Sequence, residues 1–134
     1  MLVTLLKSKI HRATVTGSSA DYEGSLTIDL ELMEKVGLVP YERILASNMA
    51  NGARFETYAI SGERGKRQII LNGATAHLGK AGDLLTIMSF IEVEPKLTCD
   101  WKPKVIVLGK SNSIITERGI VPATVAGIAS VTRG

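Results

Sequence analysis

Apolar and β-branched residues recur along the chain in short runs that clusters of turn residues interrupt. A loosely alternating segment predicts one or two strands over residues 2–16. Further strands are predicted at residues 26–28, 43–49, 54–60, 68–71, 84–93 and 104–108. Turn residues cluster at 17–21 and 62–65, and Asn51-Gly52 is a strong signal for a two-residue hairpin. About seven short strands with closely spaced turns predict a mainly β fold, a small β-barrel.

One helix is predicted directly after the strand at 26–28. Asp29 is a suitable N-cap, Glu31 places a negative charge in the first turn, and Leu30 begins an apolar stripe. Gly37 suits the position after the last helical turn, and Pro40 prevents the helix from resuming.

The length of 134 residues predicts a single domain over 1–134. The segment from about residue 120 to residue 134 is rich in small and β-branched residues without a clear period. It is interpreted as a flexible tail.

Composition narrows the classes of function. The net charge of +3 is mildly basic, but the longest basic cluster, residues 64–67, is short and is typical of a solvated turn. Aromatic residues make up only 4% of the chain, few for the stacking platforms of a single-strand nucleic-acid binder. Cys99 is the single cysteine, so no internal disulfide is expected, which favours a cytoplasmic protein.

Motifs for the common kinds of enzyme site are missing from the sequence. His11 and His77 are far apart and in no ligand pattern, so no metal is expected. We find no phosphate-binding loop, and no apolar stretch approaches the ~18 residues of a membrane span. The N-terminal apolar run is too short for a signal peptide. These observations alone lead only to a small β-rich domain.

The pair Gly24-Ser25 is informative only together with the segments that surround it in the sequence. Alone it is weak, because Gly17-Ser18 is a second such pair. From residue 1 to about residue 120, however, the sequence resembles the bacterial aspartate 1-decarboxylase family, with matching pieces in the family's order and spacing. The pieces are Lys9-Ile10-His11-Arg12, Tyr22-Glu23-Gly24-Ser25, Asn51-Gly52, Arg54-Phe55, Thr57-Tyr58-Ala59-Ile60, Glu63-Arg64-Gly65, Asn72-Gly73-Ala74 and Gly82-Asp83.

The resemblance implies a fold and a cofactor. The expected fold is a double-psi β-barrel with one or more short helices, assembled as a homotetramer with active sites between subunits. The expected cofactor is a pyruvoyl group derived from Ser25, with no metal and no pyridoxal phosphate. It would arise by self-cleavage of a zymogen between Gly24 and Ser25. The products would be residues 1–24 (the β chain) and residues 25–134 (the α chain).

The resemblance also implies an activity. L-Aspartate would form a Schiff base with the pyruvoyl group at position 25 and lose its α-carboxylate as CO2, giving β-alanine for pantothenate and coenzyme A biosynthesis. Tyr58 matches the family's proton donor, and Thr57 matches a residue implicated in cleavage at Gly24. His11 and Tyr22 match positions that line the site. The expected substrate-binding residues are Lys9, Arg54, Thr57, Asn72, Gly73, Ala74 and Thr75.

Strand periodicity offers a partial check on this site. Lys9 and His11 are two residues apart and share one face of their strand, as do Arg54 and Tyr58. Thr57 then points to the opposite face from Tyr58. Either a bulge reorients one of them, or each face serves the site of a different subunit.

Two departures from the family stand close to the expected site. Thr75 occupies a position where the family often has alanine, so a hydroxyl there could alter the polarity of the pocket. Ser47 replaces a tryptophan of some relatives, which would loosen the packing. The sequence does not decide whether the substrate is aspartate or glutamate. It also does not decide whether cleavage is spontaneous or needs a maturation factor.

Two alternatives to the enzyme remain at this point. The first is an unprocessed or inactive homologue with the same fold. The second is a small basic β-barrel that binds nucleic acid or a protein partner, whereas the enzyme needs neither nucleic acid nor a membrane. A salt-dependent affinity for oligonucleotides would favour the second.

Overall fold

A computed structural model describes residues 1–23 and 25–120 of the chain, and it is mainly β. Its strands are β1 (Val3–Thr14), β2 (Gly17–Ser19), β3 (Leu26–Asp29), β4 (Arg43–Asn48), β5 (Arg54–Gly62), β6 (Ile69–Asn72), β7 (Leu84–Val93), β8 (Lys104–Leu108) and β9 (Ile114–Arg118). The helical segments are α1 (Leu30–Val36) and three short 3-10 turns, η1 (Gly73–His77), η2 (Pro95–Leu97) and η3 (Lys110–Asn112). The mainly β fold predicted from the sequence is confirmed.

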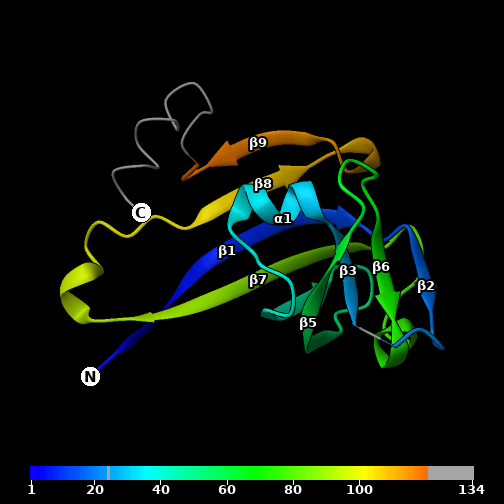
Figure 1. Cartoon of the computed structure of the whole chain (residues 1–134), viewed down its shortest axis with the longest axis horizontal. Helices are drawn as coiled ribbons and strands as arrows, with labels where there is room; N and C mark the ends of the chain where they lie inside the picture. The colour runs from blue at the N-terminus through cyan, green and yellow to red at the C-terminus, as the bar shows by residue number, and fades with distance from the viewer. Residues whose placement is uncertain (24, 121–134) are drawn as a thin grey trace.

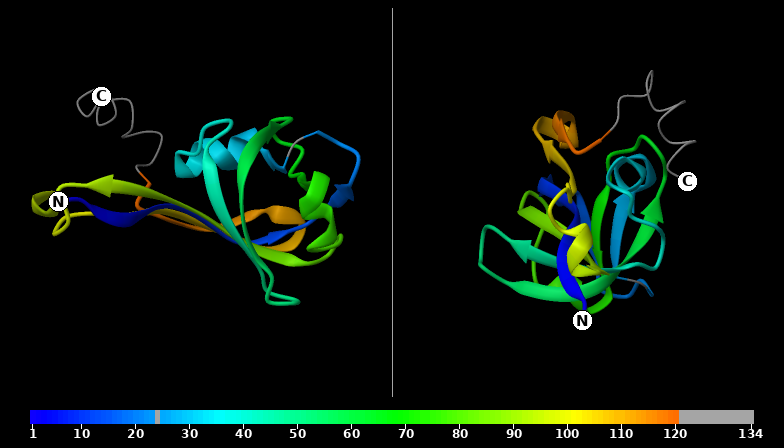
Figure 2. Two further views of the ribbon diagram at one scale, coloured as in Figure 1. Left: turned by 90° about the horizontal axis from the view of Figure 1, so that it is seen from below. Right: turned by 90° about the vertical axis from the view of Figure 1, so that its left-hand side faces the viewer.

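The strands form one mixed sheet that curls around a core. Within the described residues its order is β2-β6-β3-β5-β4-β7-β1-β8-β9. β1 pairs antiparallel with β7 and parallel with β8, while β3 pairs parallel with β5 and antiparallel with β6. This mixture, with crossovers between strands distant in sequence, is consistent with a double-psi β-barrel. β1 and β7 also run on together beyond the barrel as a projecting arm (Figure 2).

The core is aliphatic, as the scarcity of aromatic residues requires. Alternate residues of β1, β3, β4, β6, β7 and β8 point inward, where they pack against the apolar face of α1. Figure 1 shows α1 lying over β1 and β8. The largest side chains that are fully buried are Ile10, Leu26, Ile28, Leu32, Met33, Ile44, Ile69, Leu71, Leu85, Ile87, Ile106 and Leu108.

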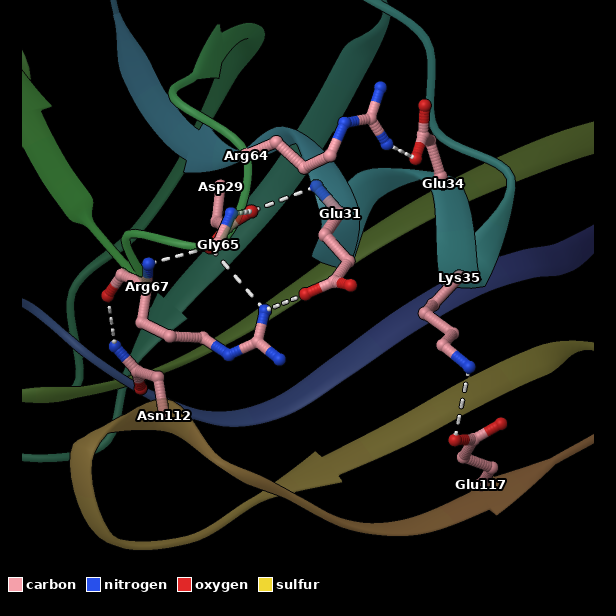
Figure 3. Close-up of polar contacts among 9 residues, drawn as sticks. All are labelled: Asp29, Glu31, Glu34, Lys35, Arg64, Gly65, Arg67, Asn112 and Glu117. Carbon is pink, nitrogen blue, oxygen red and sulfur yellow. Dashed lines mark hydrogen bonds and ion pairs between the residues drawn. The ribbon is translucent and has the colours of Figure 1, made fainter.

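Helix α1 begins and ends where the sequence predicts. The side chain of Asp29 accepts a hydrogen bond from the backbone N–H of Glu31, at 2.8 Å. Gly37 closes the helix in the left-handed region at φ +76°, and its N–H donates to the carbonyls of the last turn. The same Asp29 carboxylate also accepts from the backbone N–H groups of Gly65 and Arg67, so it ties the loop before β6 to the end of β3 (Figure 3).

Three local predictions need correction. The predicted turn at 17–21 begins instead with β2, because Gly17–Ser19 pairs in parallel with β6 at the sheet edge. The hairpin after β4 has five connecting residues rather than two, since the side chains of Asn48 and Asn51 each cap a backbone N–H within the loop. β9 was not predicted, because its exposed face is polar. The predicted tail lies, from residue 121 on, outside the described residues.

Candidate active site

Ser25 lies immediately before β3, between β6 on one side and β5 on the other. The neighbouring residue Leu26 pairs with Leu71 of β6 and with Ala59 of β5. One step back along both registers, Ser25 stands level with Asn72 and Tyr58. The backbone N–H of Asn72 donates to the Ser25 carbonyl oxygen at 2.7 Å, which continues the β3–β6 ladder to this position.

Tyr58 shares with Ser25 the outer face of the sheet. Leu26 and Ala59 are fully buried, so the residues before them on each strand point outward. The Tyr58 side chain is 38% exposed, and its ring centroid lies 6.3 Å from that of Tyr41. Two adjacent strands are about 4.8 Å apart, so Tyr58 and Ser25 are neighbours across the β3–β5 pair within one chain.

Thr57 points to the opposite face from Tyr58. It pairs with the buried Ile44, whereas Tyr58 pairs with Arg43, and the β4–β5 register is continuous through both. The bulge that would have reoriented one of them is therefore not formed. The other explanation, in which each face of β5 serves the site of a different subunit, stays a prediction.

The segment after β6 folds over Ser25. The carboxamide of Asn72 is held by a 2.7 Å hydrogen bond from Nδ2 to Thr27 Oγ1. Gly73 then turns the chain into η1 at φ +58°, a conformation that glycine adopts without strain. Ala74 is exposed, but Thr75 is buried, and its Oγ1 lies 2.6 Å from the Asn72 carbonyl oxygen and 3.1 Å from that of Ser25.

The cationic candidates gather on the outer face of β1, β7, β4 and β5. Pairing between these strands places Thr86, Ser47 and Arg54 in one row across the sheet. His11 lies where the β1–β7 register is interrupted, and Lys9 is two residues before it on β1, paired with Met88. His11 Nδ1 lies 3.4 Å from Thr86 Oγ1, and Arg54 Nη1 donates to Ser47 Oγ at 3.0 Å.

Burial of the imidazole lowers the pKa of His11, and the charges of Lys9, Arg12 and Arg118 lower it further. His11 is therefore neutral at neutral pH. A neutral imidazole can donate one hydrogen bond and accept one, and it does not add to the positive charge that Lys9 and Arg54 bring to this face.

One chain does not bring all the candidates together. Lys9 and Arg54 are separated by two intervening strands, on the order of 14 Å along the sheet. Arg54 and Tyr58 are four residues apart on β5, or about 13 Å. Ser25, Tyr58, Asn72, Gly73, Ala74 and Thr75 form one group, whereas Lys9, His11 and Arg54 lie away from it along the sheet.

The remaining expectations concern Tyr22, Gly24, metal binding and membrane spans. Tyr22 is 54% exposed, in the turn that follows β2. Gly24, on the N-terminal side of the expected cleavage, lies outside the described residues. Across residues 1–23 and 25–120 no cluster of His, Cys, Asp or Glu could hold a metal ion. In the same part of the chain, every helix is too short or too polar to cross a bilayer.

Sequence reasoning missed the polar contacts that support the candidates. Ser47, noted only as a departure that would loosen packing, accepts a hydrogen bond from Arg54 across the β4–β5 pair. Thr27 anchors the Asn72 carboxamide. Its position two residues after Ser25 on a predicted strand was a usable signal, because such residues share a face.

Comparison with known proteins finds matches over most of the chain. Residues 1–115 match the family model described as aspartate decarboxylase. The aspartate 1-decarboxylase of Leptospira biflexa is 50% identical over 113 residues, which are 84% of this chain and 96% of that protein. The corresponding protein of Chlorobium luteolum is 49% identical, covering 84% of this chain and 88% of its own. That of Myxococcus xanthus is 48% identical, covering 83% and 85%. The chain belongs to the aspartate decarboxylase family.

Proposed function

We propose that this protein removes the α-carboxylate of L-aspartate to give β-alanine and CO2, using a pyruvoyl group made from Ser25. The observation that carries the proposal is the position of Ser25 in a chain of this family. It lies at the start of β3, level with Tyr58 and Asn72, and its carbonyl oxygen accepts a hydrogen bond from the Asn72 N–H.

The group would form by cleavage of the chain's own backbone. The Ser25 hydroxyl adds to the Gly24 carbonyl carbon, the peptide C–N bond breaks and the freed amine takes the hydroxyl proton, so an ester results. Loss of the Ser25 α proton and of the Gly24 carboxylate leaves dehydroalanine. Water then replaces its nitrogen, which departs as ammonia. Thr57 is the residue that we assign, from the family, to assist the first step.

The surroundings of Ser25 fit such a group. A pyruvoyl group keeps the carbonyl of residue 25 as an amide to Leu26, and that carbonyl is the one that Asn72 and Thr75 contact. Ser25 itself is half-buried, which leaves one side open to a substrate. When present, the pyruvoyl group supplies an electrophilic carbonyl that accepts the electron pair released with CO2.

The chain's own residues would bind and protonate the substrate. The guanidinium of Arg54 suits a bidentate carboxylate contact, with Lys9 as a second cation. Tyr58, next to Ser25, delivers a proton to the carbon that has lost CO2. Gly73 and Ala74 line the substrate, and His11 and Tyr22 border the site.

Assembly as a homotetramer, with sites between subunits, would bring Lys9 and Arg54 together with the residues around Ser25. The separation of Lys9 and Arg54 from Ser25 along one sheet supports this assembly, because one small amino acid cannot bridge it. The outer face also carries the half-buried Leu45 and Met88 and the exposed Phe90, which are suited to contact another subunit.

The remaining parts of the proposal follow the family. The whole chain is one domain that becomes two chains, the product β-alanine supplies pantothenate and coenzyme A biosynthesis, and the enzyme works in the cytoplasm. Cleavage needs no metal, no pyridoxal phosphate and no nucleic acid. A maturation factor is an addition to be tested only when the isolated chain stays intact.

The test is the denatured mass spectrum of the purified protein beside that of Ser25→Ala. We expect the wild type to give residues 1–24 and residues 25–134, the larger lighter than simple hydrolysis predicts by one ammonia. The Ser25→Ala chain should stay intact and produce no β-alanine. Normal β-alanine production by that variant would refute the proposal, as would a larger fragment that begins with unmodified serine in an active sample.

A further inference from the structure

The carbonyl oxygen of Ser25 has two hydrogen-bond donors around it, both from the segment that ends β6. The backbone N–H of Asn72 lies 2.7 Å from it, and the hydroxyl oxygen of Thr75 lies 3.1 Å from it. Both residues are buried, with Asn72 3% and Thr75 7% exposed. Both donors are therefore shielded from competing water, which strengthens their interaction with a charge that develops on this oxygen.

The Thr75 hydroxyl has one proton and two acceptors. Its oxygen is 2.6 Å from the Asn72 carbonyl oxygen and 3.1 Å from the Ser25 carbonyl oxygen. While both carbonyls are neutral, the shorter contact to Asn72 holds the proton. A negative charge on the Ser25 oxygen reverses this preference, and a hydroxyl needs only to rotate to follow it. The donor is thus stronger for the charged state than for the ground state, which is the condition for catalysis.

The elimination step of the proposed self-cleavage puts charge on that oxygen. Water, acting as base, removes the α proton of Ser25 from the ester. The electron pair of the C–H bond moves onto the adjacent Ser25 carbonyl, giving an enolate whose negative oxygen is the one that Asn72 and Thr75 contact. The pair then returns to form the Cα–Cβ double bond as the C–O bond breaks and the Gly24 carboxylate leaves.

We infer that Thr75 is a catalytic residue of this elimination, with its hydroxyl and the Asn72 N–H forming an oxyanion site for the enolate of Ser25. The inference rests on the proposed function and extends it to a residue whose hydroxyl the common alanine cannot supply. Thr27 has a positioning role, because its Oγ1 accepts from Nδ2 of Asn72 at 2.7 Å and so fixes the residue that carries the other donor.

The test compares Thr75→Val, which keeps the shape and removes the hydroxyl, with Thr75→Ser, which keeps the hydroxyl. Thr16→Val is the matched control, because the Thr16 hydroxyl also donates to a backbone carbonyl of β6, that of Ile69 at 3.1 Å, but does not contact Ser25. Each precursor is made by cell-free synthesis. Samples taken over time are split, one half is treated with hydroxylamine, which cleaves esters, and both are analysed by mass spectrometry.

We expect Thr75→Val to convert about tenfold to a hundredfold more slowly than the wild type, the effect of losing one hydrogen bond to a charged oxygen in the transition state. An ester sensitive to hydroxylamine should accumulate in this variant, and not in Thr75→Ser or Thr16→Val. Serine deuterated at its α carbon should slow Thr75→Val more than the wild type, since proton removal then limits the rate. A purely structural role would produce neither the ester nor the larger isotope effect.

Two results would overturn the inference, and they are distinguishable. If Thr75→Val converts at the wild-type rate without accumulating ester, or slows without accumulating ester, the hydroxyl does not act in the elimination, although the proposed function stands. If the wild-type chain forms neither ester nor pyruvoyl, then the proposed function and this inference both fail.

Discussion

Asp29 offers a quantitative test of how the end of β3 is held. Its side chain is fully buried. Oδ1 accepts from the backbone N–H groups of Glu31 and Gly65, at 2.8 and 3.0 Å, and Oδ2 accepts from that of Arg67 at 2.6 Å. The Arg67 guanidinium lies 3.4 Å from Oδ2 (Figure 3). One carboxylate therefore satisfies a helix N-terminus and the loop before β6 at once.

The change Asp29→Asn keeps the shape of the side chain and should reduce the free energy of unfolding by about 3 kcal/mol. Of this, about 2 kcal/mol comes from the Arg67 N–H, which would face an NH2 group in place of its acceptor. About 1 kcal/mol comes from the hydrogen bonds to Oδ1, which weaken when the acceptor is neutral. The Arg67 guanidinium is not left unpaired, because it also donates to Glu31 at 2.8 Å.

The measurement is urea unfolding in the Ser25→Ala background, in which the proposed cleavage cannot occur. Both variants are compared at one fixed protein concentration, because the proposed tetramer would couple unfolding to dissociation. Asp100→Asn, at an exposed position, makes the same change of charge and should alter stability by less than about 0.5 kcal/mol. A loss below about 1 kcal/mol for Asp29→Asn would refute the claim that this carboxylate joins the two segments.

The stability difference between Asp29→Asn and its parent should also depend on pH in a definite direction. Burial alone would raise the pKa of Asp29, but the hydrogen bonds from Gly65, Arg67 and Glu31, with the charge of Arg67, outweigh it and lower the pKa below its ordinary 3.8. A lowered pKa means that the stabilisation is complete above pH 3.8 and is lost as the pH falls through the folded-state pKa. The difference between Asp29→Asn and its parent should therefore shrink only in acid. A difference that instead shrinks between about pH 5 and pH 8 would contradict this assignment.

Three further predictions concern single groups. Ser89 Oγ is buried without a hydrogen-bond partner among the described residues, so Ser89→Ala should raise the unfolding free energy by about 1 kcal/mol, and a loss of that size in urea unfolding would be the contrary result. Gly37→Ala should reduce the free energy of unfolding by about 1 kcal/mol and so lower the thermal midpoint, because φ is +76° at this position; an unchanged midpoint would contradict this prediction. Arg54→Lys should raise KM for aspartate about tenfold while cleavage proceeds normally, whereas Arg43→Lys, on the same face, should not; equal KM values would remove Arg54 from the site.

The parts of the fold with regular alternation were predictable. Residues 104–108 form β8 as predicted, because a short apolar run that follows a proline and is rich in valine and isoleucine favours a strand over a helix. The short edge strand β2 was not predictable, since Gly17, Ser18 and Ser19 carry no strand preference and are extended only because β6 lies beside them. Its existence depends on a tertiary contact that no local pattern contains.

The candidate site divides in the same way. The shared face of Lys9 and His11, and the opposed faces of Thr57 and Tyr58, followed from the period of a strand. The contact of Thr75 with the Ser25 carbonyl could not follow, because it joins residues that are 50 positions apart through the turn at Gly73. A threonine in a predicted loop gives no sign that it will be buried against a particular backbone oxygen.

The position of β1 between two other strands of the sheet has a consequence for how the protein is held together. If the chain is cut after Gly24 as proposed, β1 would belong to one polypeptide and both of its neighbours, β7 and β8, would belong to the other. Side-chain bonds also cross between the two, from Lys7 Nζ to the Gly37 carbonyl and from Trp101 Nε1 to that of Leu6, each 2.7 Å long.

Such a mature protein would be a noncovalent pair, and its refolding from separated chains would include a second-order association step. Its stability should depend more steeply on protein concentration than that of its precursor, because its unfolding also separates the two chains. Since a separated 25–134 chain cannot recover its peptide bond to Gly24, the precursor folds by an easier route than any later renaturation. On this proposal the fold forms once, as one chain, and the persistence of the mature protein then depends on its rate of unfolding as well as on its equilibrium stability.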